Sequence, residues 1–356
     1  MRITILGAGN SGCAHAAKLV ENGHEVMLVK TSRAVHNDNF YMVQRLGGIL
    51  MHDNTQNNSF FAKLLATTDV CEGIQWADVV MVLTQSLQHK ILAEKYGKCF
   101  RKGQIVFLIP GNLGSLWFRK YAEDGVIFVE GESTPYDARI VEPGCVHVLF
   151  KNVRNAVAVS SHHLSDNVVL NQIDQLFDSH KYLRRNIVES AMHNPNMIVH
   201  TIGTIMSASR IELMKGEFWM YRESFSPAVW NLVNELDREK NIVIETYGGT
   251  PLSYLDACKW RNEEDLGMDS LKVFQEYANT GGPQGPSSLD TRFMYEDVPM
   301  GLGQLELLAK KGNVDTPLAS ALITIASSLM GTDYREIART HSSIAALNKA
   351  EIIERL

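Results

Sequence analysis

The stretch that decides the fold is Ile3-Thr4-Ile5-Leu6-Gly7-Ala8-Gly9-Asn10-Ser11-Gly12, near the start of a 356-residue chain. The apolar run at residues 3–6 predicts a buried strand, and residues 13–21 predict a helix. Three glycines in GxGxxG spacing occupy the turn between them. With a second strand predicted at residues 24–29, this forms a βαβ unit of about 30 residues, which is typical of a dinucleotide-binding domain.

Each glycine of this turn has a distinct predicted task. Gly7 permits the tight turn, Gly9 lets the backbone approach a pyrophosphate, and Gly12 lets the helix pack closely on the strand. The helix N-terminus, at Asn10 and Ser11, would face the negative charge. A tight turn without a ligand is the alternative reading, but the position between strand and helix favours a cofactor site.

The end of the second strand bears on which cofactor binds. An NAD site usually presents Asp or Glu there for the ribose 2′-hydroxyl. Here the segment is Val29-Lys30-Thr31-Ser32-Arg33, which contains two cations and no acid. Lys30, Ser32 and Arg33 could hold a 2′-phosphate, so NADP(H) is favoured over NAD(H). Solvated loop charges at these positions are the alternative.

Further apolar runs extend the predicted sheet through an N-terminal domain at residues 1–185. A hairpin is expected from Leu46–His52 and Phe60–Thr67, and alternation of strands with helices indicates a doubly wound parallel sheet of the Rossmann type. The other expected strands are Ala77–Leu83, Ile105–Ile109 and Val126–Glu130.

Residues 186–356 are predicted to form an all-helical domain. Ile187–Met214 has the pattern of one long apolar helix. Ser226-Pro227 is a start signal for a helix reaching roughly Asn241. Thr316-Pro317 predicts another helix, which runs to Met330 and stops at Gly331.

Composition excludes several classes of protein. The 34 Lys and Arg against 40 Asp and Glu give a net charge of −6, which argues against a nucleic-acid partner. No apolar run approaches the ~18 residues needed to cross a bilayer, and residues 1–6 predict a strand rather than a signal peptide. We therefore expect a cytoplasmic protein without a membrane partner. The scattered cysteines predict neither a disulfide framework nor a metal site; they are Cys13, Cys71, Cys99, Cys145 and Cys258.

A polar stripe on the first long helix is the strongest candidate for catalysis. If Ile187–Met214 is one helix, His193, Asn196 and His200 fall at i, i+3 and i+7. No carboxylate completes a metal-ligand set with them, so we expect no metal site. A structural histidine satisfied by hydrogen bonds is the alternative for each ring.

Two other segments carry candidate substrate-binding residues. A Gly/Pro-rich loop at residues 281–286 leads to Arg292 and to the acidic pair Glu296-Asp297. An arginine in such a loop can bind a substrate carboxylate, although a surface salt bridge is an equal alternative. Thr134, after the strand predicted at residues 126–130, is a weaker candidate, for which a structural turn is the leading alternative.

Five motifs occur together along the chain: Gly7-x-Gly9-x-x-Gly12, Asn194-Pro195-Asn196-x-x-x-His200, Tyr221-Arg222-Glu223-x-x-Ser226-Pro227, Leu236-Asp237-Arg238-Glu239, and Arg292-x-x-x-Glu296-Asp297-Val298-Pro299-x-Gly301-Leu302. With them the chain resembles the octopine/nopaline (opine) dehydrogenase family over nearly its whole length. Members of that family reductively join the amine of an amino acid to an α-keto acid such as pyruvate, through an imine reduced by hydride. The chain departs from many members at Thr201, where they have proline, and at Gly303, where a larger residue is usual.

The resemblance implies a catalytic pair, His200 and Asp297, and a substrate-carboxylate arginine, Arg292. Asn196 joins Thr134 as a further expected substrate-binding residue. The implied partners are small molecules, and the apolar C-terminal helices allow a homodimer.

Two other functions stay open. One is a keto-acid reductase of the ketopantoate reductase type, although those enzymes carry an essential lysine on the helix entering the second domain and Ile187–His200 has none. The other is a non-catalytic NADP-binding sensor, which would need no acid–base pair.

Overall fold

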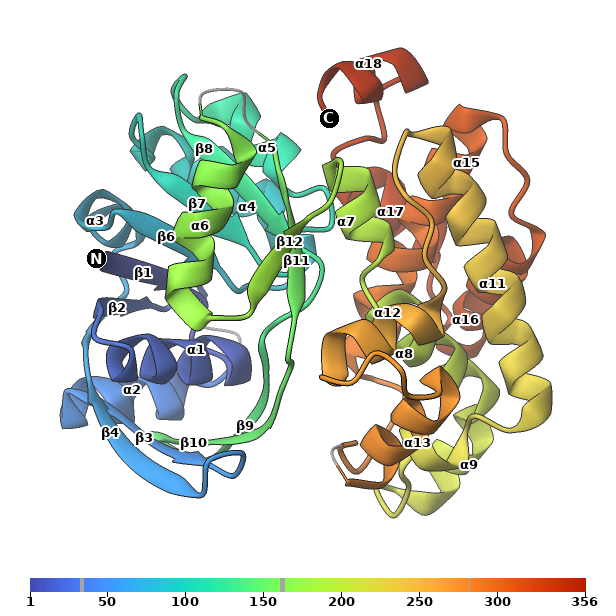
Figure 1. Cartoon of the computed structure of the whole chain (residues 1–356), viewed down its shortest axis with the longest axis horizontal. Helices are drawn as coiled ribbons and strands as arrows, with labels where there is room; N and C mark the ends of the chain where they lie inside the picture. The colour runs from blue at the N-terminus through green and yellow to red at the C-terminus, as the bar shows by residue number, and fades with distance from the viewer. Residues whose placement is uncertain (33–34, 161–163, 281) are drawn as a thin grey trace. The chain divides into compact units, whose positions relative to one another are not determined.

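The computed structural model describes residues 1–32, 35–160, 164–280 and 282–356. The chain divides into two compact units, Met1–Leu183 and Arg184–Leu356 (Figure 1). The division falls two residues before the expected domain boundary. An N-terminal Rossmann unit and a helical C-terminal unit are the fold class that the sequence predicted.

The first unit is built on an eight-stranded sheet with the order β12-β11-β8-β7-β6-β1-β2-β5 among its described residues. All neighbouring strands run parallel except β8 and β11, which are antiparallel. The strands are β1 (Arg2–Leu6), β2 (Glu25–Val29), β5 (Leu65–Thr67), β6 (Val79–Val82), β7 (Ile105–Leu108), β8 (Ile127–Gly131), β11 (Asn155–Val159) and β12 (His180–Leu183).

Helices cover both faces of this sheet, because its central strands are apolar on both sides. One face packs against α1 and α6, and the other against α3, α4 and α5. The helical segments of the unit are α1 (Asn10–Glu21), α2 (Asn37–Leu46), α3 (Val70–Trp76), η1 (Ser86–Gln88), α4 (His89–Tyr96), η2 (Gly97–Cys99), α5 (Ser115–Tyr121) and α6 (Asp166–Phe177).

A second sheet of four strands, in the order β4-β3-β10-β9, corrects the predicted hairpin. Its strands are β3 (Gly48–Asp53), β4 (Asn58–Lys63), β9 (Tyr136–Glu142) and β10 (Cys145–Lys151). β3 and β4 do pair antiparallel, but residues 65–67 form β5 of the main sheet, and Leu46 ends α2. β10 pairs with β3 across some ninety residues of sequence, a non-local contact that local patterns do not reveal.

The second unit consists of helices in its described residues. They are α7 (Ile187–Met192), α8 (Asn196–Met206), α9 (Ala208–Met214), α10 (Met220–Glu223), α11 (Pro227–Thr246), α12 (Tyr254–Asn262), α13 (Ser270–Thr280), α14 (Arg292–Tyr295), the π-helix η3 (Val298–Leu302), α15 (Gly303–Gly312), α16 (Pro317–Met330), α17 (Tyr334–His341) and α18 (Lys349–Glu354). The stop of α16 at Gly331, in the left-handed region at φ 60°, is confirmed. α11 runs five residues beyond its predicted end.

The single helix predicted over Ile187–Met214 is wrong, since α7, α8 and α9 occupy that stretch. Pro195 has no N–H to donate, and its ring disfavours a helical conformation at Asn194. The chain therefore breaks between α7 and α8. Ser207 separates α8 from α9.

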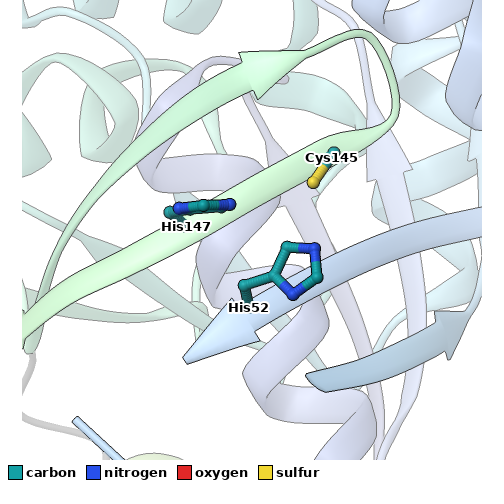
Figure 2. A group of neighbouring side chains, drawn as sticks. All are labelled: His52, Cys145 and His147. Atoms are coloured by element: carbon teal, nitrogen blue, oxygen red, sulfur yellow. The ribbon is translucent and has the colours of Figure 1, made fainter. Parts of the chain in front are cut away.

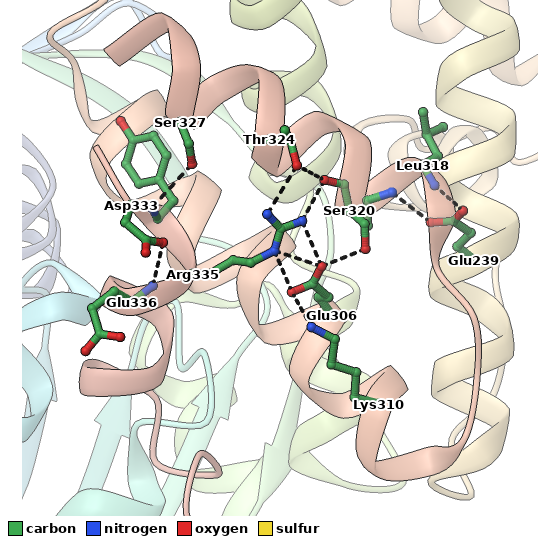
Figure 3. A network of polar contacts seen from close by, with 12 residues as sticks. Glu239, Glu306, Lys310, Leu318, Ser320, Thr324, Ser327, Asp333, Arg335 and Glu336 are labelled. Atoms are coloured by element: carbon green, nitrogen blue, oxygen red, sulfur yellow. Dashed lines mark hydrogen bonds and ion pairs between the residues drawn. The ribbon is translucent and has the colours of Figure 1, made fainter. Parts of the chain in front are cut away.

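A network of ionic side chains ties the C-terminal helices together (Figure 3). Arg335 of α17 donates hydrogen bonds to both carboxylate oxygens of Glu306 on α15, at 3.0–3.1 Å. Ser320 of α16 and Lys310 also donate to Glu306. Nearby, Glu239 of α11 accepts the N–H groups of residues 318 and 319 and so caps α16.

The prediction that cysteines form no disulfide is wrong, because Cys71 of α3 and Cys99 of η2 are joined, with 5.5 Å between their Cα atoms. Cys13, Cys145 and Cys258 are free and buried. No helix among the described residues combines the length and hydropathy needed to span a bilayer. The cytoplasmic location and the homodimer stay predictions.

Candidate active site

The glycine turn between β1 and α1 is tight at two of its three glycines. Gly7 has φ +121°, a conformation that side chains rarely permit, and a Cβ there would lie 2.7 Å from the carbonyl oxygen of Leu83. A Cβ at Gly12 would overlap the carbonyl oxygen of Gly7. Gly9, in contrast, faces open space: a Cβ added there would have one neighbour among the described residues, a ring atom of His36 at 3.8 Å. The turn is packed closed at two glycines and open at the one expected to approach a phosphate.

The end of β2 borders a hollow of about 370 Å³. The described side chains around it carry no carboxylate; they are Lys30, Thr31, Ser32, Phe40, Tyr41, Gln44 and Thr68. The ammonium of Lys30 donates to the Val35 carbonyl at 2.6 Å, and partial burial lowers the pKa of Lys30. Ser32 is exposed. Arg33 lies outside the described residues.

Three other predicted residues of this unit already have hydrogen-bond partners. Asn10 accepts the N–H of Ile140 and so ties the start of α1 to β9. The Ser11 hydroxyl lies 3.2 Å from Nδ1 of His15 within α1. The Thr134 hydroxyl donates to the carbonyl of Tyr136, two residues later. The contact at Thr134 matches the structural turn that the sequence left as an alternative.

In the helical unit, the structure brings His200 and Asp297 together. Nδ1 of His200 lies 2.7 Å from Oδ2 of Asp297, and both side chains are buried. On the other side of the ring, Nε2 of His200 lies 3.0 Å from the hydroxyl of Tyr221. With Asp297 ionised and accepting from Nδ1–H, the neutral ring has its lone pair on Nε2, where the Tyr221 O–H can donate.

Four elements hold this trio. His200 lies in the middle of α8, Tyr221 lies on α10, and Asp297 lies between α14 and η3. The ring of Phe293 stacks on His200 with centroids 3.7 Å apart. A π-helix directly after Asp297 is a feature that often accompanies functional sites.

Arg292 starts α14 beside the trio. Its Nε lies 3.6 Å from Oε2 of Glu296, and its side chain is 45% exposed. Burial alone would lower the pKa of Arg292, but the carboxylates of Glu296 and Asp297 raise it overall. An arginine side chain that is nearly half exposed can bind a further carboxylate.

The predicted polar stripe of His193, Asn196 and His200 does not exist as one helical face. His193 follows the end of α7, and its Nε2 lies 3.1 Å from the carbonyl oxygen of Thr250. Burial lowers the pKa of His193 well below its ordinary value, and the contact with a backbone carbonyl matches the structural histidine that the sequence left as an alternative. Asn196 begins α8 and is half-buried.

Tyr221 and Phe293 are the neighbours of His200 that reasoning from individual residues missed. Tyr221 did stand in one of the five motifs, but nothing local indicated that its hydroxyl meets a histidine 21 residues earlier. Their residue types alone do not distinguish them from aromatic side chains of an ordinary core.

Comparisons with known proteins relate the chain to opine dehydrogenases. Residues 183–330 match the family model described as NAD/NADP octopine/nopaline dehydrogenase, alpha-helical domain. The chain is 27% identical to an opine dehydrogenase of Arthrobacter sp. (strain 1C), over 94% of this chain and 92% of the relative.

Two solved structures share the fold. One is an octopine dehydrogenase with NADH and pyruvate, with a TM-score of 0.75, 16% identity, and coverage of 99% of this chain and 98% of the other. The second is an NADP⁺-bound yersinopine dehydrogenase, with a TM-score of 0.71, 11% identity, and coverage of 100% and 96%.

Proposed function

We propose that the chain, an NAD(P)-dependent oxidoreductase whose residues 183–330 match the octopine/nopaline dehydrogenase family model, joins the amine of an amino acid to an α-keto acid such as pyruvate. The product is an N-(carboxyalkyl)amino acid. The observation that carries this proposal is the buried His200, hydrogen-bonded to Asp297 through one ring nitrogen and to a tyrosine hydroxyl through the other.

His200 is the acid–base group in this proposal. An amino acid arrives as its ammonium form, and only the neutral amine can attack the keto carbon. Nε2 of His200 takes the proton, because imidazole is the side chain suited to this exchange near neutral pH. Asp297 keeps the proton on Nδ1 and stabilises the imidazolium that forms. After attack, a proton shifts from the nitrogen to the alkoxide and forms the carbinolamine. The imidazolium then returns its proton to the carbinolamine hydroxyl, which leaves as water and gives the protonated imine.

Arg292 and Asn196 orient the substrate in this proposal. A guanidinium can bind a carboxylate through two parallel hydrogen bonds, which a lysine cannot reproduce. Both substrates carry a carboxylate beside the reacting carbon or nitrogen, so binding one of them fixes the reacting group. Tyr221 holds Nε2 of His200 until the amine displaces its hydroxyl.

The Rossmann unit would hold the cofactor at Gly7, Gly9 and Gly12 and at the N-terminus of α1. When bound, the nicotinamide supplies the hydride that reduces the imine. Thr134 could bind the keto-acid side. We propose NADP(H) as the preferred cofactor, because Lys30 and Ser32 border the hollow at the end of β2 and no carboxylate does among the described residues.

The test is oxidation of NADPH in the presence of pyruvate, measured with and without a mixture of amino acids. We expect oxidation only when both substrates are present, and His200→Ala should slow it by about 10²–10⁴-fold. Oxidation with pyruvate alone would identify a simple keto-acid reductase. Tight NADPH binding without turnover on any combination of keto acid and amino acid would identify a sensor.

Cofactor preference has its own test. Lys30→Ala should lower the ratio of kcat/KM for NADPH to kcat/KM for NADH by about tenfold, since one charged contact to the 2′-phosphate is lost. Lys95→Ala on α4, an exposed lysine away from the hollow, is the control. An unchanged ratio in Lys30→Ala would contradict the role of that residue.

A further inference from the structure

The four-stranded sheet of the first unit packs one face into the core and turns its other face away from it. Side chains alternate along each strand, so Ile49 and Met51 of β3 and Val146 and Val148 of β10 point into the core with α1. The residues between them point the other way. His52, Cys145 and His147 belong to that outer set.

These three side chains converge on one place (Figure 2). His52 and His147 are direct partners in the parallel pairing of β3 and β10, and their ring centroids lie 4.9 Å apart. Cys145 precedes His147 by two residues and therefore shares its face. Each residue offers a ligand atom, and these atoms all lie within 4.8 Å of one another. Cys145 is buried, and both histidines are half-buried.

One of the histidines is already oriented for a ligand. Nδ1 of His52 lies 2.7 Å from the hydroxyl of Ser59 on the adjacent strand β4. This contact leaves Nε2 of His52 for another partner, and in Figure 2 a ring nitrogen of His52 turns toward the sulfur of Cys145. Metal-binding histidines commonly hydrogen-bond through the ring nitrogen that does not bind the metal.

We propose that His52, Cys145 and His147 form a binding site for a borderline-soft divalent metal ion such as Zn²⁺. Two imidazole nitrogens and one thiolate sulfur are a ligand set that such ions prefer over the oxygen-binding Mg²⁺ and Ca²⁺. A tetrahedral ion bonds nitrogen at about 2.0–2.1 Å and sulfur at about 2.3 Å, so its ligand atoms lie about 3.3–3.7 Å apart. The side chains have to rotate so that the three ligand atoms come slightly closer together. A water molecule would occupy the fourth coordination position.

The charged neighbours of the cluster set the conditions for binding. Burial, and then Glu142, raise the pKa of the Cys145 thiol, so a metal ion must displace its proton. Arg139 pairs with His147 across β9 and β10, but its guanidinium donates to the carbonyl oxygen of Ala138 at 2.8 Å.

The experiment uses the full-length protein and Zn²⁺ or Co²⁺ alone as the probe. Calorimetry should give one Zn²⁺ per chain, and Co²⁺ should produce a thiolate-to-metal charge-transfer band in the near ultraviolet. Cys145→Ser should abolish that band. His147→Ala should weaken Zn²⁺ binding by more than 100-fold, and Ser59→Ala, which removes only the partner of His52, by about tenfold.

Matched variants test whether the effect belongs to this cluster. Cys258→Ser changes another buried free thiol, and His341→Ala changes another half-buried histidine; both should bind Zn²⁺ and Co²⁺ like the unmodified protein. Circular dichroism of each variant without metal checks that it is folded. Unaltered binding in folded Cys145→Ser and His147→Ala, or weak binding of several ions without a thiolate band, would overturn the proposal. None of these outcomes depends on the dehydrogenase activity.

Discussion

The hydroxyl of Tyr221 lies 3.0 Å from Nε2 of His200, on the side of the ring opposite Asp297. The histidine is thereby held by an acceptor at one nitrogen and a hydroxyl at the other. A hydroxyl can donate to the neutral ring and accept from the protonated one, so this contact is compatible with both states of an acid–base group.

Tyr221→Phe should lower kcat by about tenfold and leave the KM for NADPH unchanged, because one hydrogen bond to the proposed base is lost while the aromatic ring stays packed. Steady-state kinetics on the amine and keto-acid pair measures this. Tyr247→Phe is the control, since it removes a buried hydroxyl that donates to the carbonyl oxygen of Leu308 instead of meeting His200. If Tyr221→Phe kept the kcat of the unmodified enzyme, the tyrosine would contribute only packing.

His200→Ala and Asp297→Asn should each lower turnover by about 10²–10⁴-fold while the fold survives, because each removes part of the proposed proton-transfer pair. Turnover is measured beside NADPH binding and circular dichroism, both of which should be retained. His193→Ala is the matched control, a buried histidine of the same unit that bonds to a backbone carbonyl. Turnover close to that of the unmodified enzyme in either variant would remove that residue from the mechanism.

The sequence predicted those features that depend on local patterns. Gly7 and Gly12 indicated a close strand-to-helix turn, and the structure has it. His200 and Asp297 were paired through the family resemblance, and they lie within hydrogen-bond distance. Thr316-Pro317 and Gly331 marked both ends of a helix correctly, because capping residues act on their own turn of the chain.

Apart from the break at Pro195, the missed features depend on contacts between distant residues. β10 joins β3 through pairing that places His147 beside His52, so a spacing rule for metal ligands could not find that cluster. Cys71 and Cys99 meet because α3 and η2 pack together. The break at Pro195 was different, since its signal was local and the apolar pattern around it outweighed it.

A pair of substitutions can test separately whether Gly9 lets a pyrophosphate approach and whether Gly12 is needed for close packing of the turn. Gly9→Ala should fold normally, because its Cβ would lie no closer than 3.8 Å to any described neighbour, but it should raise the KM for NADPH about tenfold or more by blocking the approach of the pyrophosphate. Gly12→Ala should instead destabilise the Rossmann unit, because the new Cβ would overlap the Gly7 carbonyl oxygen.

Thermal unfolding and NADPH titration of both variants make the comparison. An equal loss of stability in the two variants would contradict the open geometry at Gly9. Unchanged NADPH affinity in Gly9→Ala would place the pyrophosphate elsewhere.

The Glu306–Arg335 pair predicts how the helical unit responds to acid. Burial alone would raise the pKa of Glu306, but hydrogen bonds from Arg335, Ser320 and Lys310 lower it from 4.5 to about 2. A carboxyl whose folded pKa is depressed stabilises the fold fully above its unfolded pKa, and that contribution is lost as the pH falls toward the folded value. The shift corresponds to about 3 kcal/mol.

Glu306→Gln should therefore lower the free energy of unfolding by about 3 kcal/mol near neutral pH, and the difference from the unmodified protein should shrink as the pH falls from about 4.5 toward about 2. Urea denaturation at a series of pH values measures this. Glu235→Gln, which breaks the exposed pair with Arg238, should change stability little at any pH. A Glu306→Gln deficit that stays constant down to the lowest pH would show that the lost stability comes from packing rather than from the charge.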